Sequence, residues 1–544
     1  YIAGKLRCFI MLYNSFLMSL EPTKLPLTTK DFDAQKVGFC AGCGCGCGYI
    51  LYLRDNKIVD LYGHPSDKRG VGSFCTKGIT YIQEISKNPI RLKGIFFKHG
   101  EELKSIDLSH AIELLKEKLS KGKTAFLLGR QAGIEEYLLA KDITEDVFVD
   151  APVVDFVPSS LHPTQWKGSK FILSVDAEPV FSEVMATRWL VDAIESGAYL
   201  FCLSSRYETL CAKAKERRLL KPDLMMDFLE SLLDPEKKEE RIEFVKKSLF
   251  LLRGSLVLIG AHLLNSPFEK KVIGIVSRLR NKYGINYSFV GDLMPFLAKR
   301  LEEFFERLEE FDNLVVFGNL FRYFKEEHLK ALEKKFVVSF QAFPNITAHY
   351  SHLLFASTMF YERDFINYRH GFGYLVYSPK TLEPEEGIYN PYEVLSSAFS
   401  KKVDVDAFLQ NMGLDPQRLK EEGEVYLKGK DIALVKDISG EIPRSDLFLY
   451  TDSTLVEDLG HWNPWTHDME RLQRAYINPH TVKRLGLRHS IEIRGVSFEL
   501  HTTENIAEGV IFIPSEYEEF QPFDPGYRVG AFAQRPYHRY EVLI

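Results

Sequence analysis

The sequence predicts an α/β protein of several domains: a small cysteine-rich domain, two doubly wound domains with parallel sheets, and a β-rich closing domain. Three observations predict this fold class. Cysteines and glycines concentrate near the front of the chain. Short runs of Val, Ile, Leu and Phe then alternate with helical segments, which is typical of parallel sheets covered on both faces. From Asp446 onward the pattern changes to alternating β segments. A chain of 544 residues is also too long for a single core.

The first domain is predicted over residues 36–88, after an N-terminal extension at 1–35. Three cysteines form a C-x2-C-x3-C motif and a fourth follows after 27 residues, at Cys40, Cys43, Cys47 and Cys75. Thiolates at such spacing are the usual ligands of a [4Fe–4S] cluster. The interleaved glycines permit positive φ and allow backbone N–H groups to point at sulfur. The alternating residues after Gly48 turn at Asp55-Asn56, which predicts a β-hairpin.

Two alternatives to the cluster stay open, a zinc site and unliganded cysteines. Zinc ribbons favour paired C-x2-C knuckles, and only one such pair occurs here. Cys45 could replace a neighbouring ligand. The remaining cysteines are expected to be buried free thiols in a reducing compartment: Cys8, Cys202 and Cys211.

Charge and hydropathy exclude other classes. The net charge of −6 gives no electrostatic reason to expect nucleic acid. The apolar run at 9–20 is shorter than the ~20 residues needed to cross a bilayer, so direct membrane insertion is not expected. No twin-arginine signal is visible, and a cytoplasmic protein is the expectation.

The α/β part is predicted as two domains. One is discontinuous, at 89–125 and 312–400, and opens with a helix at 108–119 behind a Ser109 cap. The other is nucleotide-binding-like, at 126–311. Ligands of such folds bind beyond the carboxyl ends of the strands, which are predicted at 124–129, 169–175, 198–205, 255–262, 285–292, 313–319 and 335–340. Residues 401–444 are predicted as a linker, and 445–544 as the closing domain.

With this order of parts the chain resembles the molybdopterin oxidoreductase family, which includes formate dehydrogenases, formylmethanofuran dehydrogenases and the large subunit of respiratory complex I. The resemblance rests on six segments in the family's order. They are CAGCGCGCGYILYLRDNKIVDLYGHP…GSFCTKG, NPIRLKG, LLGRQAGIEEYLLAK, FILSVDAEPVFSEVMATRWLVDAIESGAYLFCLSSR, FPNITAHYSHLLFASTMFYERDFINY and YINPHTVKRLGLRHSIEIRG.

The resemblance implies a closing domain that is a dinucleotide-binding β-barrel, and a molybdenum or tungsten ion carried by two pterin guanine dinucleotides. Lys77 occupies the place where active members put a lysine between cluster and pterin; a surface lysine is the alternative. Residues that match cofactor-binding positions are Gly129, Arg130, Arg206, Asn319, Asn367, Gly460, His461, Trp462 and Thr466.

The chain also departs from the family at its active-site motifs. No cysteine follows the "VD" pair, so Asp155 is the only candidate metal ligand there. Asp176 and Glu178 replace the usual glycine and asparagine of a diphosphate loop, which places negative charge where an anion should bind. Ser204-Ser205 replace the Asp-Pro that normally receives guanine.

Two functional hypotheses follow from the resemblance. The first is a molybdopterin-dependent, formate-dehydrogenase-like oxidoreductase that passes electrons through one [4Fe–4S] cluster. The second is a non-catalytic electron-transfer subunit that keeps the cluster and has lost the metal pterin, as in the complex I large subunit. A scaffold whose cluster serves only folding is a weaker third. Either redox hypothesis implies a partner subunit or a ferredoxin-type carrier.

Overall fold

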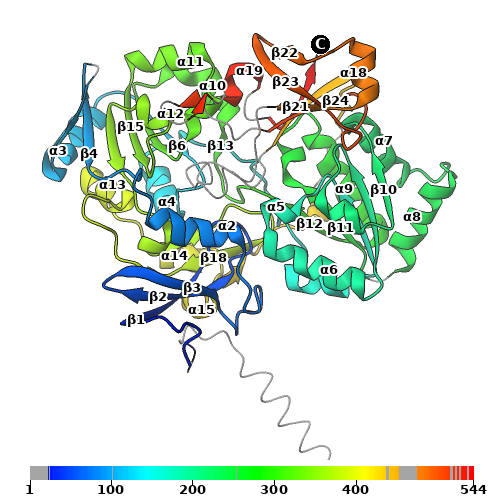
Figure 1. The fold of residues 1–544 in the computed structure, drawn as a ribbon, viewed down its shortest axis with the longest axis horizontal. Helices are drawn as coiled ribbons and strands as arrows, with labels where there is room; N and C mark the ends of the chain where they lie inside the picture. The colour runs from blue at the N-terminus through cyan, green and yellow to red at the C-terminus, as the bar shows by residue number, and fades with distance from the viewer. Residues whose placement is uncertain are drawn as a thin grey trace, which may run out of the picture.

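The computed structural model describes most of the chain as one assembly of four parts (Figure 1). The described residues are 23, 25–100, 102–252, 254–435, 440–452, 474–514, 519–520, 524–525, 528–535 and 538–543. Two α/β halves lie side by side. The cysteine domain lies at one end of the assembly and the closing sheet at the other.

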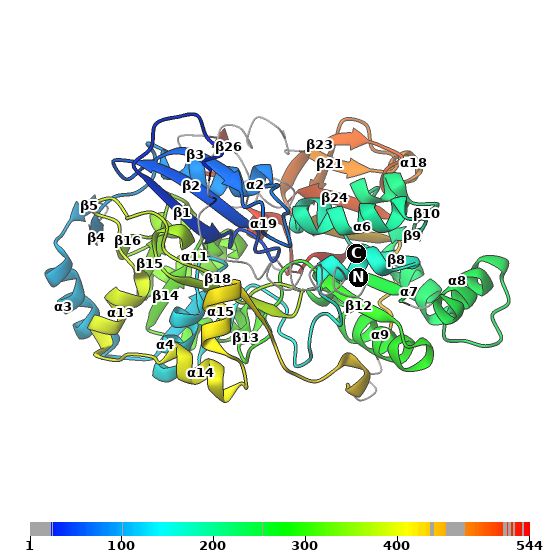
Figure 2. The same cartoon turned by 90° about the horizontal axis from the view of Figure 1, so that it is seen from below.

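The cysteine domain is built on a three-stranded antiparallel sheet of order β1-β2-β3. Its strands are β1 (Ala34–Phe39), β2 (Gly48–Arg54) and β3 (Lys57–Gly63). Asp55 and Asn56 both have positive φ, 51° and 56°, which confirms the predicted hairpin turn. A short helix, α2 (Thr76–Ile79), begins directly after Cys75 and continues as a π-helical turn, η1 (Thr80–Glu84). Seen from below, this domain lies across the first α/β half (Figure 2).

The first α/β half contains an eight-stranded sheet of order β13-β7-β6-β14-β15-β16-β4-β5, which is parallel from β13 to β16. Its strands are β4 (Ile95–His99), β5 (Glu102–Ser105), β6 (Thr124–Leu128), β7 (Val147–Val149), β13 (Lys299–Arg300), β14 (Asn313–Phe317), β15 (Phe336–Gln341) and β16 (Leu353–Ala356). The predicted boundary at 125/126 therefore cuts through β6, and β7 and β13 also belong to this half. Parallel strands are buried on both faces, which explains their continuous apolar runs.

The second α/β half contains a five-stranded parallel sheet of order β10-β9-β8-β11-β12. Its strands are β8 (Phe171–Val175), β9 (Tyr199–Ser204), β10 (Glu216–Leu219), β11 (Leu256–Gly260) and β12 (Asn286–Val290). The predicted alternation of strand and helix is confirmed in both halves.

Helices cover the two sheets. They are α3 (Leu108–Leu119), α4 (Ile134–Ile143), α5 (Pro179–Ser182), α6 (Thr187–Glu195), α7 (Pro222–Ser231), α8 (Glu240–Leu251), α9 (Glu269–Tyr283), α10 (Leu301–Arg307), α11 (Glu326–Ala331), α12 (Ile346–His349) and α13 (Pro391–Phe399). The bounds of α3 match the prediction, but its cap does not. Asp107, not Ser109, accepts the N–H of His110 at 2.9 Å, because the residue before the first helical turn is the one with extended backbone.

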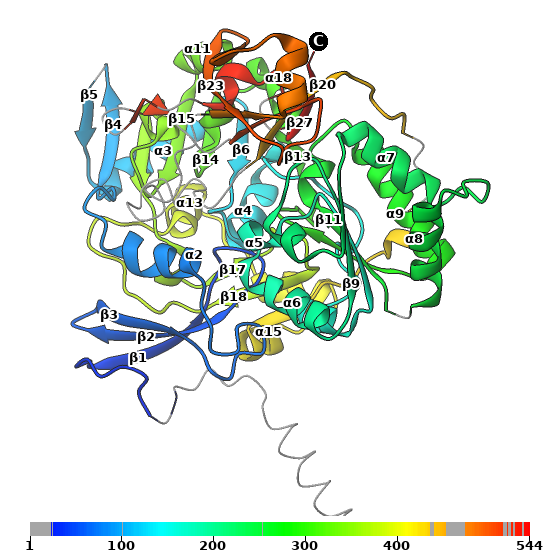
Figure 3. The ribbon, with the colours of Figure 1, turned by 45° about the vertical axis from the view of Figure 1, so that its right-hand side comes forward.

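The segment predicted as a linker is folded. It forms α14 (Val405–Asn411), α15 (Pro416–Glu422) and β19 (Glu424–Tyr426), and β19 joins a sheet with β17 (Phe365–Asn367) and β18 (Tyr374–Ser378). This small sheet lies between the cysteine domain and the second half (Figure 3).

The closing domain is a six-stranded mixed sheet of order β22-β23-β21-β24-β20-β27. Its described elements are β20 (Leu447–Asp452), β21 (Arg474–Ile477), α18 (Pro479–Leu485), β22 (Ser490–Ile493), β23 (Val496–Thr502), β24 (Val510–Pro514), α19 (Val529–Phe532) and β27 (Tyr540–Leu543), with a small pair β25 (Glu519–Phe520) and β26 (Asp524–Pro525). Phe448 and Tyr450 pack into the core of the five-stranded half, whereas Leu449 packs into that of the eight-stranded half. The closing sheet therefore joins the two halves. Its curled form is compatible with the predicted barrel.

In the part of the chain that the structure describes, no helix combines the length and the apolar character that a membrane span requires.

Candidate functional site

The cysteine loop has the backbone that a metal cluster requires. The N–H of Cys40 donates to the carbonyl of Cys47 at 2.9 Å and closes the loop, and Gly46 has φ of 60°. Two backbone N–H groups point at sulfur: Gly42 donates to Cys40 Sγ and Gly78 donates to Cys75 Sγ, both at 3.4 Å. N–H···S bonds of this kind stabilise thiolate ligands of iron–sulfur clusters.

The four predicted ligands lie close enough to influence one another. Burial raises the pKa of Cys40, and the thiolates of Cys43, Cys75 and Cys47 raise it further. Burial likewise raises the pKa of Cys75 to about 12, with Cys43 and Cys47 adding to the shift. Thiolates this close to one another repel unless a cationic group lies between them. The residues therefore fit an iron–sulfur core.

Cys45 is a neighbour of these ligands and interacts with them as a thiol. Its hydrogen bond to Cys43 is the largest cause that lowers the pKa of Cys43, to about 6. Among the described residues, no group of three His, Cys, Asp or Glu side chains is arranged to hold a single metal ion. Cys202 and Cys211 are buried and unbridged, as predicted.

Three side chains from the first α/β half and the small sheet hold successive carbonyl oxygens of the cysteine loop. Arg130 donates to the carbonyl of Gly42 at 3.4 Å, Asn367 to that of Cys43 at 3.4 Å, and Tyr374 to that of Gly44 at 3.0 Å. Asn367, predicted to bind cofactor, thus contacts the cluster loop and is not among the cavity-lining residues named below. These contacts dock the loop on the rest of the molecule.

Lys77 is only 3 % exposed, so the surface alternative is wrong. Its charge acts on the cysteines, because it lowers the pKa of both Cys43 and Cys75. The charge of Lys77 also acts on Glu183. Burial raises the pKa of Glu183 to about 7, the Cys43 thiolate adds to the shift, and Arg130 and Lys77 oppose it. The ammonium of Lys77 therefore lies in a buried environment beside the predicted cluster.

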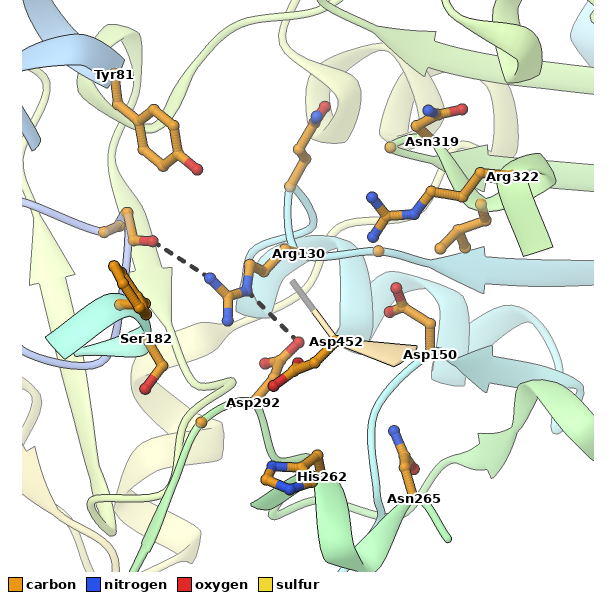
Figure 4. Close-up of a pocket in the computed structure, with 18 of the residues that line it drawn as sticks. Tyr81, Arg130, Asp150, Ser182, His262, Asn265, Asp292, Asn319, Arg322 and Asp452 are labelled. Carbon is orange, nitrogen blue, oxygen red and sulfur yellow. Dashed lines mark hydrogen bonds and ion pairs between the residues drawn. The ribbon is translucent and has the colours of Figure 1, made fainter. Parts of the chain in front are cut away.

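A cavity lies where the two halves, the cysteine loop and the closing sheet meet (Figure 4). It encloses about 1530 Å³ of space free of protein atoms, part of it open to solvent. Ala41 and Gly42 of the cysteine loop form part of its wall. The cavity therefore adjoins the predicted cluster, as a group that exchanges electrons with it would require.

The eight-stranded half contributes the loops after β6 and β14 to this wall. Gly129 and Arg130 follow β6, and Gly318 and Asn319 follow β14; all four line the cavity. Strand β6 pairs with β7 on one edge and with β14 on the other. The strand order reverses between β6 and β14, so the loops that follow these two strands flank the topological switch point of the sheet. A Cβ on Gly129 would lie 2.5 Å from the carbonyl oxygen of Phe317, which explains why only glycine fits there. Gly129, Arg130 and Asn319 thus lie where the sequence predicted.

The five-stranded half and the closing sheet form the opposite wall. Arg206 follows β9, and its guanidinium lies 3.6 Å from the carboxylate of Asp452 in an ion pair. It also stacks on Phe512, with 4.7 Å between the guanidinium carbon and the ring centroid. His262 and Asn265 follow β11 on the same wall (Figure 4).

The lining residues that the sequence reasoning missed include His262, Asn265, Arg322 and Arg539. Three of them lie in loops after strands, which is the signal that could have found them. Burial raises the pKa of Asp150 at the end of β7, but Arg369, which contacts its carboxylate at 2.6 Å, lowers it, and the charges of Arg322 and Arg539 add to that effect. The Thr358 hydroxyl also lines the cavity and has no hydrogen-bond partner among the described residues. Cationic and unpaired polar groups of this kind fit an anionic ligand.

Asp155 is placed differently from the predicted metal ligand. Its side chain is 75 % exposed, forms an ion pair with Lys430 at 3.5 Å and does not line the cavity. The metal-ligand role stays a prediction that this placement does not favour. The predicted residues Gly460, His461, Trp462 and Thr466 lie outside the described residues.

Fold and site together define a protein with a cysteine-rich domain that fits an iron–sulfur cluster and a large inter-domain cavity beside it. Residues 36–87 match the family model "Molybdopterin oxidoreductase Fe4S4 domain". Among the solved structures, acetylene hydratase from Pelobacter acetylenicus shares the fold, with a TM-score of 0.69, 13 % identity, and coverage of 92 % of this chain and 96 % of that chain. A comparison with curated proteins gave no match. The match assigns residues 36–87 to this iron–sulfur domain type, and the likeness to the solved structure shows that the whole chain shares its fold.

Proposed function

We propose that this chain is a molybdenum- or tungsten-pterin oxidoreductase that exchanges electrons with a partner carrier through one [4Fe–4S] cluster. The observation that carries the proposal is the shared wall: residues of the cysteine loop, Ala41 and Gly42, line the same cavity as Arg130 and Arg322. A bound metal pterin would supply two-electron chemistry in that cavity. Arg130 and Lys77 link the cavity to the cysteines, since Arg130 contacts the loop and Lys77 acts on the thiols.

Within this class, formate-dehydrogenase-like chemistry is the proposed activity. It is supported by the NPIRLK and CTKG runs, which resemble the catalytic branch of the family. In the structure, Arg91 of the first run is buried and forms an ion pair with Glu362 at 2.5 Å. Lys77 of the second run is buried beside the cysteines. The shared fold does not select the reaction, because a hydratase has it too.

A second candidate is the non-catalytic electron-transfer subunit. The observation that favours it is the position of Asp155, which points to solvent and leaves the cavity without the predicted metal ligand. In this alternative the cysteine domain would serve as an electron relay, and the cavity would hold no metal.

One measurement separates the two. The protein is purified without oxygen from cells supplied with molybdate and tungstate, and iron, molybdenum, tungsten and extractable pterin are quantified. Molybdenum or tungsten near one per chain, with pterin and about four irons, is the expected result. Four irons without metal or pterin would establish the electron-relay alternative. A ferredoxin-type protein is the proposed probe for the partner, tested by its reduction when the loaded protein is given formate.

A further inference from the structure

The two α/β halves offer two equivalent places for a dinucleotide, one at each topological switch point. In a doubly wound sheet, a ligand binds in the crevice between the loops where the strand order reverses. That crevice lies after β6 and β14 in the eight-stranded half, and after β8 and β11 in the five-stranded half. The structure makes the two crevices very different.

The crevice of the eight-stranded half is open and carries no acid in its loops. Gly129-Arg130-Gln131 follow β6 and Gly318-Asn319-Leu320 follow β14, and all six residues line the cavity. The glycines allow a ligand to approach the backbone. Arg322 supplies positive charge, and so does Arg130, whose guanidinium lies 3.5 Å from the carboxylate of Asp292. This arrangement is typical of a site for a diphosphate.

The crevice of the five-stranded half is bridged by the chain itself. Asp176, directly after β8, has φ of 50° and is fully buried. Its Oδ2 lies 3.1 Å from Nε2 of His262, which follows β11, so a single contact spans the switch point. The hydroxyl of Tyr540, on β27 of the closing sheet, also donates to this carboxylate.

The donors that could bind phosphate in this crevice are occupied by carboxylates. The N–H of Ser205 donates to Asp176 at 2.8 Å, and the hydroxyls of Ser204 and Ser205 donate to it at 3.2 and 3.1 Å. Two further backbone groups, the N–H of Thr209 and of Val180, donate to Glu178 at 2.6 and 3.3 Å. Asp176 and Glu178 thus take the place that an anionic ligand would need.

This deepens the proposed function and rests on it: we propose that the chain binds one pterin dinucleotide, in the crevice after β6 and β14, and that Asp176 and Glu178 replace the diphosphate of a second. The pair of pterin dinucleotides expected from the family resemblance then does not fit this chain. Arg206 has a structural role, because its charge offsets Asp452 and the two neighbouring glutamates, Glu178 and Glu208.

The first test is the ratio of pterin to metal in the protein purified without oxygen. Molybdenum and tungsten are counted by mass spectrometry, pterin by fluorescence after oxidation, and nucleotide after acid hydrolysis. One pterin and one nucleotide per metal atom is expected. Two per metal would overturn this inference and leave the proposed function intact. No metal and no pterin would overturn the proposed function and this inference with it.

The second test compares two matched variants, Arg322→Lys and Arg206→Lys. Both arginines line the cavity, and lysine cannot form the bidentate contacts that arginine makes with phosphate. The inference expects Arg322→Lys to reduce pterin content at least fivefold and Arg206→Lys to leave it unchanged. Iron content of about four per chain shows in each case that the protein has folded around its cluster. Equal loss of pterin in an iron-replete Arg206→Lys protein would overturn the inference.

Discussion

The Asp176 carboxylate lies 3.1 Å from Nε2 of His262 and is completely buried, although its position in the sequence suggested repulsion of a bound anion. Burial alone raises the pKa of Asp176, but the hydrogen bonds from His262, Tyr540 and Ser205 outweigh it and lower the pKa. The ionised Asp176 carboxylate therefore contributes to the stability of the folded protein. It stabilises the native state above the ordinary aspartate pKa, and this contribution is lost as the pH falls toward the lowered value.

His262→Ala should destabilise the protein, because it leaves the Asp176 carboxylate buried with one partner fewer. Leaving a buried carboxylate without one of its hydrogen-bond partners costs about 1–3 kcal/mol. The expected result is a lower temperature of thermal unfolding and acid unfolding that begins at a higher pH than in the wild type. Differential scanning calorimetry between pH 4 and pH 7 measures both. His110→Ala, at an exposed position of α3, is the control and should change neither. An unchanged acid profile in His262→Ala would contradict the role given to the pair.

Glu135→Gln should stabilise the protein at alkaline pH. Burial raises the pKa of Glu135 to about 7, and Glu136 adds to the shift. A carboxyl group whose folded pKa is raised holds its proton longer in the native state, so the native state loses stability as the pH rises from about 4.5 to 7. The variant removes this loss. Its unfolding temperature should exceed that of the wild type at pH 8 and match it at pH 4, and a constant difference across this range would refute the shift.

Cys47→Ser should lose the cluster, whereas Cys45→Ser should keep it. Cys47 closes the loop by accepting the N–H of Cys40, and its charge raises the pKa of Cys40 and Cys75. Cys45 acts on its neighbours through hydrogen bonds as a thiol. Iron content and the paramagnetic resonance spectrum of the reduced protein distinguish the two variants. Four irons in Cys47→Ser and fewer in Cys45→Ser would exchange the assignments.

Lys77→Met should make the reduction potential of the cluster more negative by tens of millivolts. A buried positive charge favours the electron-rich state, and 59 mV corresponds to about 1.4 kcal/mol for one electron. Lys77→Arg keeps the charge and is the matched control, so its potential should stay near that of the wild type. Redox titration followed by paramagnetic resonance gives the values. Equal reduction potentials in Lys77→Met and the wild type would contradict an effect of the Lys77 charge on the cluster.

Asp155→Asn should retain its metal and pterin. The side chain is exposed and pairs with Lys430, so an amide changes little at this position. Metal analysis of the variant beside the wild type measures the outcome. Loss of molybdenum or tungsten from a protein that keeps its iron would instead support Asp155 as the metal ligand.

Local patterns in the sequence predicted most of the fold. The C-x2-C-x3-C spacing, the turn at Asp55-Asn56 and the apolar runs of both sheets each depend on neighbouring residues, and the structure contains all of them. The same patterns failed where an element was short or polar. Thus β7, with three residues, and β19, inside a charged segment, were not predicted, because such strands form only when a neighbouring strand pairs with them.

The predicted cluster ligands follow from the sequence itself, since three of them lie within one loop whose glycines shape its backbone. The second crevice was decided only by the tertiary structure. Asp176 forms hydrogen bonds with His262 and Tyr540, which are 86 and 364 residues away in the sequence. A local sequence pattern cannot predict contacts between residues so far apart in the chain. A charge read from the sequence has a sign but no partner. Only the tertiary structure places His262 and Tyr540 against Asp176. These contacts make the carboxylate part of the folded structure, where it occupies the second crevice.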